Sequence, residues 1–270
     1  MNPTALARHV TPLMALLFVN GCALSSAEEV AEQTISVKPG TAVKVETRNG
    51  RIHVVEGRDG KVRIGYIKRA RASASPRKLL SQIKVVVKQQ SGTLYVTAEH
   101  PSGSLTKQFG VSFELTVPKG TRLHLETRNG SVELGFMNGT VTATTRNGSI
   151  KAKHVAGPLK ASTHNGSIHV DGVASNFDVR SRNGSIRVQL ANELKLTGKC
   201  VAETRNGSVR ISAPKTLAAN LKAKTRNGSI HSEFKLASSS RNRASGKIGA
   251  GGHPIRLKTH NGSIYLVSRQ

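Results

Sequence analysis

A short motif, Thr/Ser-Arg/His-Asn-Gly, recurs along this chain and constrains its fold more than any other feature. From Asn129 onward, successive copies are separated by 18, 18, 18, 23, 21 and 34 residues. Repetition at a nearly fixed period is typical of proteins in which each unit packs on its neighbours. The eight asparagines of the motif are Asn49, Asn129, Asn147, Asn165, Asn183, Asn206, Asn227 and Asn261.

The residues around each motif alternate as β-strands do. In residues 159–165 every second residue is apolar or small, and Ile168-His169-Val170 alternates again after the Asn-Gly step. When the repeats are superposed, apolar residues fall into columns, as expected of stacked rungs. One column contains Val141, Leu159, Phe177, Cys200, Leu221 and Ile255; another contains Ile52, Val132, Ile150, Ile168, Ile186, Val209, Ile230 and Ile264.

Asn-Gly between two strands is also the signal of a tight hairpin, which would give an antiparallel meander or sandwich. The repeated 18-residue spacing favours the solenoid, because it places identical residues in register. We therefore predict an all-β fold, a single-stranded parallel β-solenoid (β-helix) with rungs of about 18–23 residues. We expect the eight asparagines to form its corners, with inward side chains that hydrogen-bond up the stack, while glycine supplies the corner conformation.

The motif is unevenly distributed, which predicts distinct regions. Residues 34–120 contain one copy but keep the alternation, so we expect a less regular N-terminal β region. Within it, Pro76 after Ser75 predicts a short helix over residues 76–83. Residues 121–270 should form the repeat solenoid. Residues 236–253, rich in serine, glycine and basic residues, should form a flexible loop between its last two rungs.

The N-terminus has the features of an export signal. In residues 1–21, Arg8 precedes an apolar stretch that is too short to span a bilayer. The sequence Val19-Asn20-Gly21-Cys22 resembles a bacterial lipobox, which implies lipidation of Cys22; an ordinary secretory signal is the alternative. By analogy with the sorting of bacterial lipoproteins, Ala23 after the cysteine favours the outer membrane. The sequence does not distinguish the periplasmic face of that membrane from its outer face. Residues 22–33 are small and polar and should form a tether.

Over residues 34–270 the chain resembles the bacterial putative-adhesin family of β-strand-repeat domains. The resemblance rests on the motif-poor first third, the Val-Pro-Lys-Gly-Thr step at 117–121, and the Gly-Ser-Val/Ile repeats. It implies an exported single-layer β-solenoid. The family has no defined function, so the resemblance implies no particular target.

The chain carries 41 Lys and Arg against 15 Asp and Glu, a formal net charge of +26. One motif position is always basic, and we call its members the basic ladder: Arg48, Arg128, Arg146, His164, Arg182, Arg205, Arg226 and His260. A second basic column follows the corners: Lys151, His169, Arg187, Arg210 and His231. Like charges on neighbouring rungs repel, and Glu46, Glu126 and Glu203 should offset part of this repulsion. The columns predict binding of a polyanion such as lipopolysaccharide, an acidic glycan or DNA. The alternative is a structural envelope protein whose charges maintain solubility.

The sequence offers little for other functions. Asp171 and Asp178 are isolated, so we predict no catalytic residues; a polysaccharide-cleaving β-helix enzyme is a third alternative. No cofactor is expected, and no metal site, because the histidines lack fixed carboxylate or cysteine neighbours. Specific nucleic-acid binding is disfavoured, because aromatic residues make up 3% of the chain and do not interleave the basic ones. Cys200 should be a buried thiol. The oligomeric state is left open.

Overall fold

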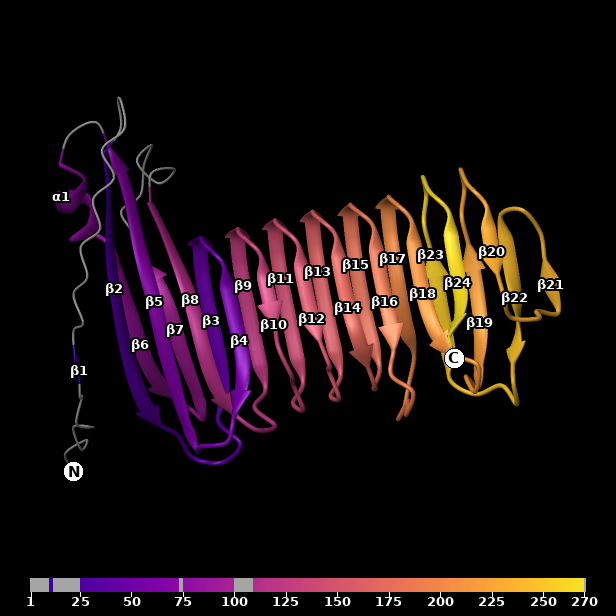
Figure 1. The fold of residues 1–270 in the computed structure, drawn as a ribbon, viewed down its shortest axis with the longest axis horizontal. Coiled ribbons are helices and arrows are strands. Elements are labelled where there is room, and N and C mark those ends of the chain that lie inside the picture. The colour runs from indigo at the N-terminus through magenta and orange to yellow at the C-terminus, as the bar shows by residue number, and fades with distance from the viewer. Residues whose placement is uncertain (1–9, 12–24, 73–74, 100–108, 270) are drawn as a thin grey trace.

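The computed structural model describes residues 10–11, 25–72, 75–99 and 109–269, which form an elongated, almost entirely β molecule (Figure 1). Two 12-stranded sheets enclose the core along the described chain. The first, which we call the return sheet, has the order β1 (Val10–Thr11), β2 (Ser25–Ser36), β5 (Lys61–Ala72), β8 (Phe109–Pro118), β4 (Ile52–Gly57), β10 (Val132–Leu134), β12 (Ile150–Lys153), β14 (Ile168–Val173), β16 (Ile186–Leu190), β18 (Val209–Pro214), β24 (Ile264–Arg269) and β20 (Ile230–Ser232). The second, the ladder sheet, has the order β21 (Ser238–Ser239), β22 (Arg243–Ile248), β19 (Ala219–Lys224), β23 (Pro254–Lys258), β17 (Cys200–Asn206), β15 (Phe177–Asn183), β13 (Leu159–Asn165), β11 (Val141–Asn147), β9 (Leu123–Asn129), β3 (Ala42–Asn49), β7 (Thr93–Glu99) and β6 (Lys84–Gln90).

Each rung is one strand of the ladder sheet, an Asn-Gly corner and one strand of the return sheet. Neighbouring rungs pair in parallel and in register, with Asn147 opposite Asn165 between β11 and β13, and Ile150 opposite Ile168 between β12 and β14. The corners therefore stack and do not form separate hairpins. The predicted parallel β-solenoid is confirmed.

The core is a single layer of side chains between the two sheets. In β13 the inward residues Leu159, Ala161 and Thr163 are buried and the residues between them are at least partly exposed. The predicted apolar columns are buried throughout, except that Ile230 at the end of the stack is half-buried. Cys200 is fully buried in one of these columns, and burial raises the pKa of its thiol. The thiol is therefore protected from reaction, as its apolar column predicts.

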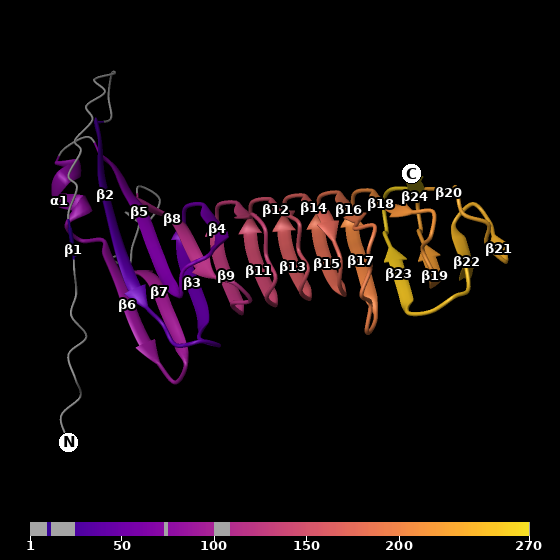
Figure 2. The same ribbon diagram turned by 60° about the horizontal axis from the view of Figure 1, so that its bottom comes forward.

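The rungs do not follow chain order at the C-terminal end. β23 and β24 lie between β17/β18 and β19/β20 (Figures 1 and 2), although β19 and β20 precede them in the sequence. The prediction of a flexible loop over 236–253 is wrong, because β22 pairs antiparallel with β19 at the end of the ladder sheet. Ala244 and Ile248 are buried and give β22 an apolar face, which the Ser/Gly-rich composition concealed.

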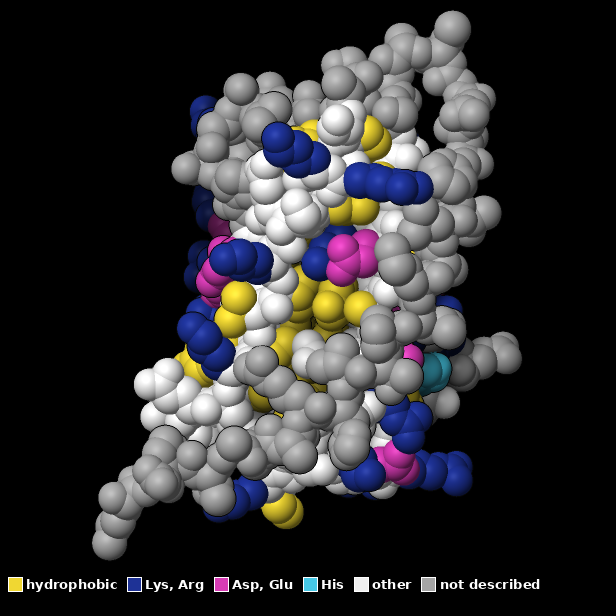
Figure 3. Space-filling view, turned by 90° about the vertical axis from the view of Figure 1, so that its left-hand side faces the viewer, with side chains coloured by type: hydrophobic (Ala, Val, Ile, Leu, Met, Phe, Trp, Pro, Cys, Tyr) yellow, Lys and Arg dark blue, Asp and Glu magenta, His cyan; other side chains and the backbone are white. Residues whose placement is uncertain are grey.

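The N-terminal end is built differently from the repeats. β3 and β4 form a regular rung next to β9 and β10, so the motif at Asn49 belongs to the stack. Beyond that rung, β2 and β5 pair antiparallel over 12 residues, and β6 pairs antiparallel with β7. The helix α1 covers only Pro76–Leu80 of the predicted 76–83. Viewed from this end, apolar side chains of described residues are visible among basic and acidic ones (Figure 3).

The tether predicted for residues 22–33 is wrong for residues 25–33, which lie in β2. Their small and polar composition conceals a strand held by its partner, with ion pairs between Glu28 and Arg69 (2.7 Å) and between Glu29 and Lys68 (2.8 Å). Cys22 lies outside the described residues, as does segment 1–21 apart from β1. The signal peptide and the lipid anchor therefore stay predictions.

Candidate functional site

Threonine and glycine of the motif hold each corner on the one before it. The buried hydroxyl of Thr163 donates to the carbonyl of Gly148 on the preceding rung (2.9 Å). Glycine is required by close approach, because a Cβ at Gly166 would lie 2.0 Å from that same carbonyl oxygen. The serine after the glycine also bridges rungs, since Ser149 Oγ accepts from the backbone N–H of Ser167 (3.3 Å).

The asparagines form one continuous chain of side-chain amides. Asn165 Nδ2 donates to Asn147 Oδ1 (2.8 Å), and the same bond links each rung to the next. The predicted inward orientation is wrong, because Asn165 is exposed. Thr163, two residues earlier, already fills the inside of the corner, so the asparagine side chain lies along the stack. In spatial order the chain of amides runs through Asn49, Asn129, Asn147, Asn165, Asn183, Asn206, Asn261 and Asn227.

Asn165→Asp should destabilise the solenoid by about 1–3 kcal/mol, the cost of losing a buried or networked hydrogen bond. A carboxylate has no hydrogen to donate to Asn147 Oδ1, and places a second acceptor 2.8 Å from it. Urea unfolding followed by circular dichroism measures the change. Asn242→Asp, at an exposed turn position, adds the same charge outside the amide chain and should change stability by less than about 0.5 kcal/mol. Equal midpoints for the two variants would contradict a stabilising amide chain.

The basic ladder lies on the outer face of the ladder sheet, one residue before each corner. Its arginines at 128, 146, 182, 205 and 226 are exposed, and Arg48, His164 and His260 are partly exposed. Because β23 is inserted out of order, His260 lies between Arg205 and Arg226 in space, although it follows both in the sequence. With strands about 4.8 Å apart, eight positions extend over about 34 Å.

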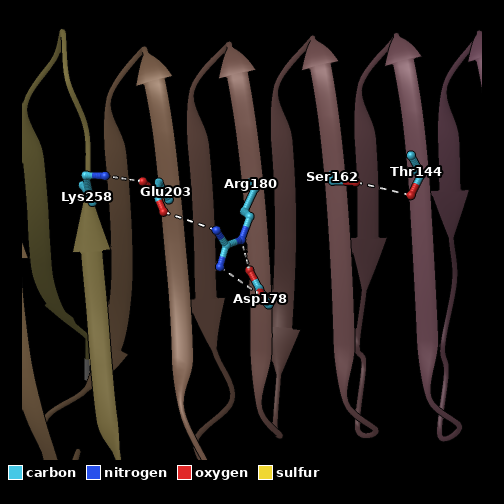
Figure 4. A network of polar contacts seen from close by, with 6 residues as sticks. All are labelled: Thr144, Ser162, Asp178, Arg180, Glu203 and Lys258. Atoms are coloured by element: carbon cyan, nitrogen blue, oxygen red, sulfur yellow. Dashed lines mark hydrogen bonds and ion pairs between the residues drawn. The ribbon is translucent and has the colours of Figure 1, made fainter.

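Within the described residues, none of the six ladder arginines makes an ion pair. The expected compensation by Glu46 and Glu203 is wrong. Glu46 binds Lys44 (2.7 Å), and this bond raises the pKa of Lys44. Glu203 binds Lys258 (2.6 Å) and Arg180 (3.4 Å), its partners on the two adjacent strands (Figure 4). Both carboxylate oxygens of Glu203 are thus taken by cations on the adjacent strands, and Glu203 forms no ion pair with Arg205.

The second basic column lies on the outer face of the return sheet. Lys151, His169, Arg187 and Arg210 are successive register partners, as predicted. His231 is separated from them by Tyr265, because β24 lies between β18 and β20. The Tyr265 ring is sandwiched between Arg210, at 4.7 Å from its centroid, and the stacked ring of His231, at 5.2 Å. The two basic columns lie on different sheets, so the structure does not join them into one surface.

Sequence analysis missed a shallow pocket at the N-terminal end of the ladder. Arg48 and Arg128 line it together with Glu46, Glu126 and Thr97 of β7. β7 carries no motif, and no sequence signal placed it beside β3. Among the described residues, no group of three His, Cys, Asp or Glu side chains could hold a metal ion. In the described part of the chain, no helix is both long enough and apolar enough to cross a membrane.

Comparisons with known proteins support the predicted resemblance for part of the chain. Residues 158–266 match the family described as Toastrack DUF4097. No curated protein matches the chain. The class of protein is therefore a parallel β-solenoid, of which residues 158–266 are similar to this family.

Similar solved structures include a putative adhesin from Bacteroides fragilis, with 13% identity, 88% of this chain and 97% of that chain covered, and a TM-score of 0.46. A putative adhesin from Parabacteroides distasonis has 9% identity, with 88% and 97% covered and a TM-score of 0.37. A putative cell adhesion protein from Clostridium sporogenes has 11% identity, with 89% and 100% covered and a TM-score of 0.30. Because the identities and TM-scores are this low, these structures do not indicate what this chain binds.

Proposed function

We propose that this chain is a non-enzymatic binding module of the bacterial cell envelope, and that its basic ladder binds a linear polyanion. One observation carries the proposal. In the Thr-Arg-Asn-Gly-Ser repeat, the threonine, asparagine, glycine and serine each hold neighbouring rungs together, as Thr163, Asn165, Gly166 and Ser149 illustrate. Among the described ladder arginines, the one side-chain contact between rungs is the long contact of Arg182 Nη1 with His164 Nε2 (3.5 Å), and the stack does not depend on it.

The geometry of the ladder suits an extended anionic ligand. Guanidinium groups stay charged at all physiological pH values, and their forked donors match phosphate and carboxylate groups. Neighbouring arginines of the ladder repel one another, so a ligand with regularly spaced anionic groups would gain from every rung it covers. A ladder about 34 Å long could contact several such groups at once. Phosphorylated lipopolysaccharide and acidic glycans have this chemistry.

The acidic side chains support a non-enzymatic role. Asp178 is held by Arg180 (2.6 Å), which also pairs with Glu203, and the bond to Asp178 raises the pKa of Arg180. Asp171 lies on the other sheet, in β14. Glycan hydrolysis uses two carboxyl groups that act on one glycosidic bond, whereas Asp178 and Glu203 both bind Arg180.

Binding to immobilised lipopolysaccharide, with and without its phosphate groups, tests the proposal. We expect the protein to be retained at low salt, to elute as NaCl rises, and to bind the dephosphorylated form much more weakly, because contacts to charged groups release counterions. Absence of retention at low salt, or equal retention on both forms, would favour a structural scaffold whose charges serve solubility.

The module is proposed to be exported and held at the outer membrane by lipidated Cys22. Metabolic labelling with a radioactive fatty acid should mark the wild-type protein and leave Cys22→Ser unlabelled, because the acyl chains are attached through the cysteine. Cys200→Ser is the matched control and should be labelled like the wild type. An unlabelled wild type would replace the lipobox with a plain secretory signal.

A further inference from the structure

β23 and β24 are the last two strands in the sequence, but they do not lie at the end of the stack of rungs. β23 and β24 pair with β17 and β18 on one side and with β19 and β20 on the other. The chain leaves β18, builds β19 and β20 one rung further on, adds the β21–β22 hairpin, and then returns (Figures 1 and 2). We call residues 254–269 the inserted rung, and the space between β17/β18 and β19/β20 its slot.

The contacts that hold the inserted rung are those of every other rung. Asn261 Nδ2 donates to Asn206 Oδ1, and Asn227 Nδ2 donates to Asn261 Oδ1, both at 2.7 Å. Gly207 N–H donates to the carbonyl of Asn261, and Gly262 N–H to that of Asn227, both at 2.9 Å. Contacts of this kind depend on the repeat and the register. They would be the same if the rung came from another molecule.

The slot has to be filled, because the inward-facing side chains of the strands on both sides of it are apolar. Ile255, Leu257, Ile264 and Leu266 of the inserted rung are each at most 1% exposed. Without them, the inward faces of the strands on both sides of the slot would meet water. Either the two flanking rungs close on one another or a rung of the same pattern enters.

The segment that leads into the inserted rung is built to change direction. Residues 249–253 connect β22 to β23 and include Gly249, Gly251 and Gly252 at φ of +56°, +80° and +147°. Five residues can reach about 17 Å when extended. Passing β19 to reach the slot requires about two strand spacings, near 10 Å. The hinge is therefore about 7 Å longer than the return to the slot of its own chain requires, and its glycines allow it to take other directions.

We propose that the inserted rung is exchangeable, and that the slot is a docking site for the same rung of a second copy of this chain. Reciprocal exchange gives a domain-swapped dimer that keeps every rung contact. Chain order supports this, since residues 219–248 are complete before residues 254–269 arrive, and the slot stays open until then. This inference does not rest on polyanion binding.

A thiol at position 255 tests the exchange, because Ile255 is the register partner of Cys200. In the full chain carrying Cys22→Ser and Ile255→Cys, isotope-labelled and unlabelled molecules are mixed, unfolded in urea, and refolded in glutathione buffer. We expect a disulfide between Cys200 and position 255 that joins labelled to unlabelled chains. By mass action, the dimer-to-monomer ratio should rise about tenfold with a tenfold rise in monomer concentration. The Ile255→Ser control should give no covalent dimer. Disulfides confined to single chains at every concentration, or none at all, would overturn the proposal.

Shortening the hinge tests the proposal without added thiols. Deleting Gly251 and Gly252 leaves three residues, whose reach of about 10 Å barely allows return to the slot of the same chain. We expect light scattering to show a shift from monomer to dimer, with an unchanged β-sheet circular dichroism spectrum. Deleting Gly60, in an exposed turn, is the control and should leave the mass unchanged. A hinge-shortened protein that stays monomeric at concentrations where the wild type dimerises would overturn the proposal.

Discussion

Ile168→Asp is expected to unfold the solenoid over more than one rung. Ile168 is completely buried, and its register partners Ile150 and Ile186 are buried equally. The change removes apolar burial and places a carboxyl group in the middle of that column, with no hydrogen-bond donor aimed at it. The expected loss is about 4 kcal/mol or more, a large part of the 5–15 kcal/mol that stabilises a typical domain.

Urea unfolding monitored by circular dichroism measures this effect, with His169→Asp as the matched control. His169 is the next residue on β14, points outward, and lies between Lys151 and Arg187, so the control should be neutral or slightly stabilising. Burial would raise the pKa of the introduced carboxyl at position 168 above its unfolded value of about 3.9. The loss of stability should therefore grow as pH rises above that value and shrink as pH falls below it. Similar unfolding midpoints for the two variants at pH 7 would contradict a continuous core.

The repeated part of the fold could be predicted because its information is local and periodic. Alternation in residues 159–165 fixes which side chains face inward, and an 18-residue period sets the register between Asn147 and Asn165. The fold then follows from burial of the columns. Those two observations favoured the solenoid over the hairpin array, and the parallel register between the rungs confirms it.

The order of the last rungs could not be predicted for the same reason. The motifs at Asn227 and Asn261 are almost identical, so either rung satisfies the contacts next to Asn206. The structure distinguishes them through β22, which pairs antiparallel along the whole of β19 on one edge and leaves the other edge of β19 for β23. The orientation of the asparagines was also hidden, because strand alternation does not extend through a corner.

The basic ladder was visible in the sequence, but its freedom from ion pairs was not. Glu203 lies two residues before Arg205, and only the register shows that Arg180 and Lys258 flank it on adjacent strands. Glu46, Asp178 and Glu203 thus bind cations other than the ladder arginines. The ladder arginines therefore keep more unneutralised positive charge than the sequence predicts. Removing that charge is a sensitive test of polyanion binding.

Replacing Arg146, Arg182 and Arg205 together by Gln should greatly weaken retention on heparin or lipopolysaccharide without destabilising the protein. All three are exposed and make no ion pair among the described residues, so the core and the amide chain are left intact. Relief of like-charge repulsion should keep the unfolding midpoint equal to or slightly above that of the wild type. Each charge that neutralises a polyanion adds about 0.7–0.9 to the slope of log affinity against log salt, as known for nucleic acids. The slope should therefore become shallower by about two to three.

The matched control replaces Lys195, Lys199 and Lys215 by Gln, which removes the same number of charges from exposed connections between rungs, away from the Asn-Gly corners. If the ladder is the binding site, the control should keep nearly the wild-type salt slope, because lysines outside the contact release few counterions. If net charge alone drives retention, the two triple variants should elute together, at lower salt than the wild type. That result would contradict a ladder-specific site, and the regular spacing of the arginines would then be a consequence of the repeat alone.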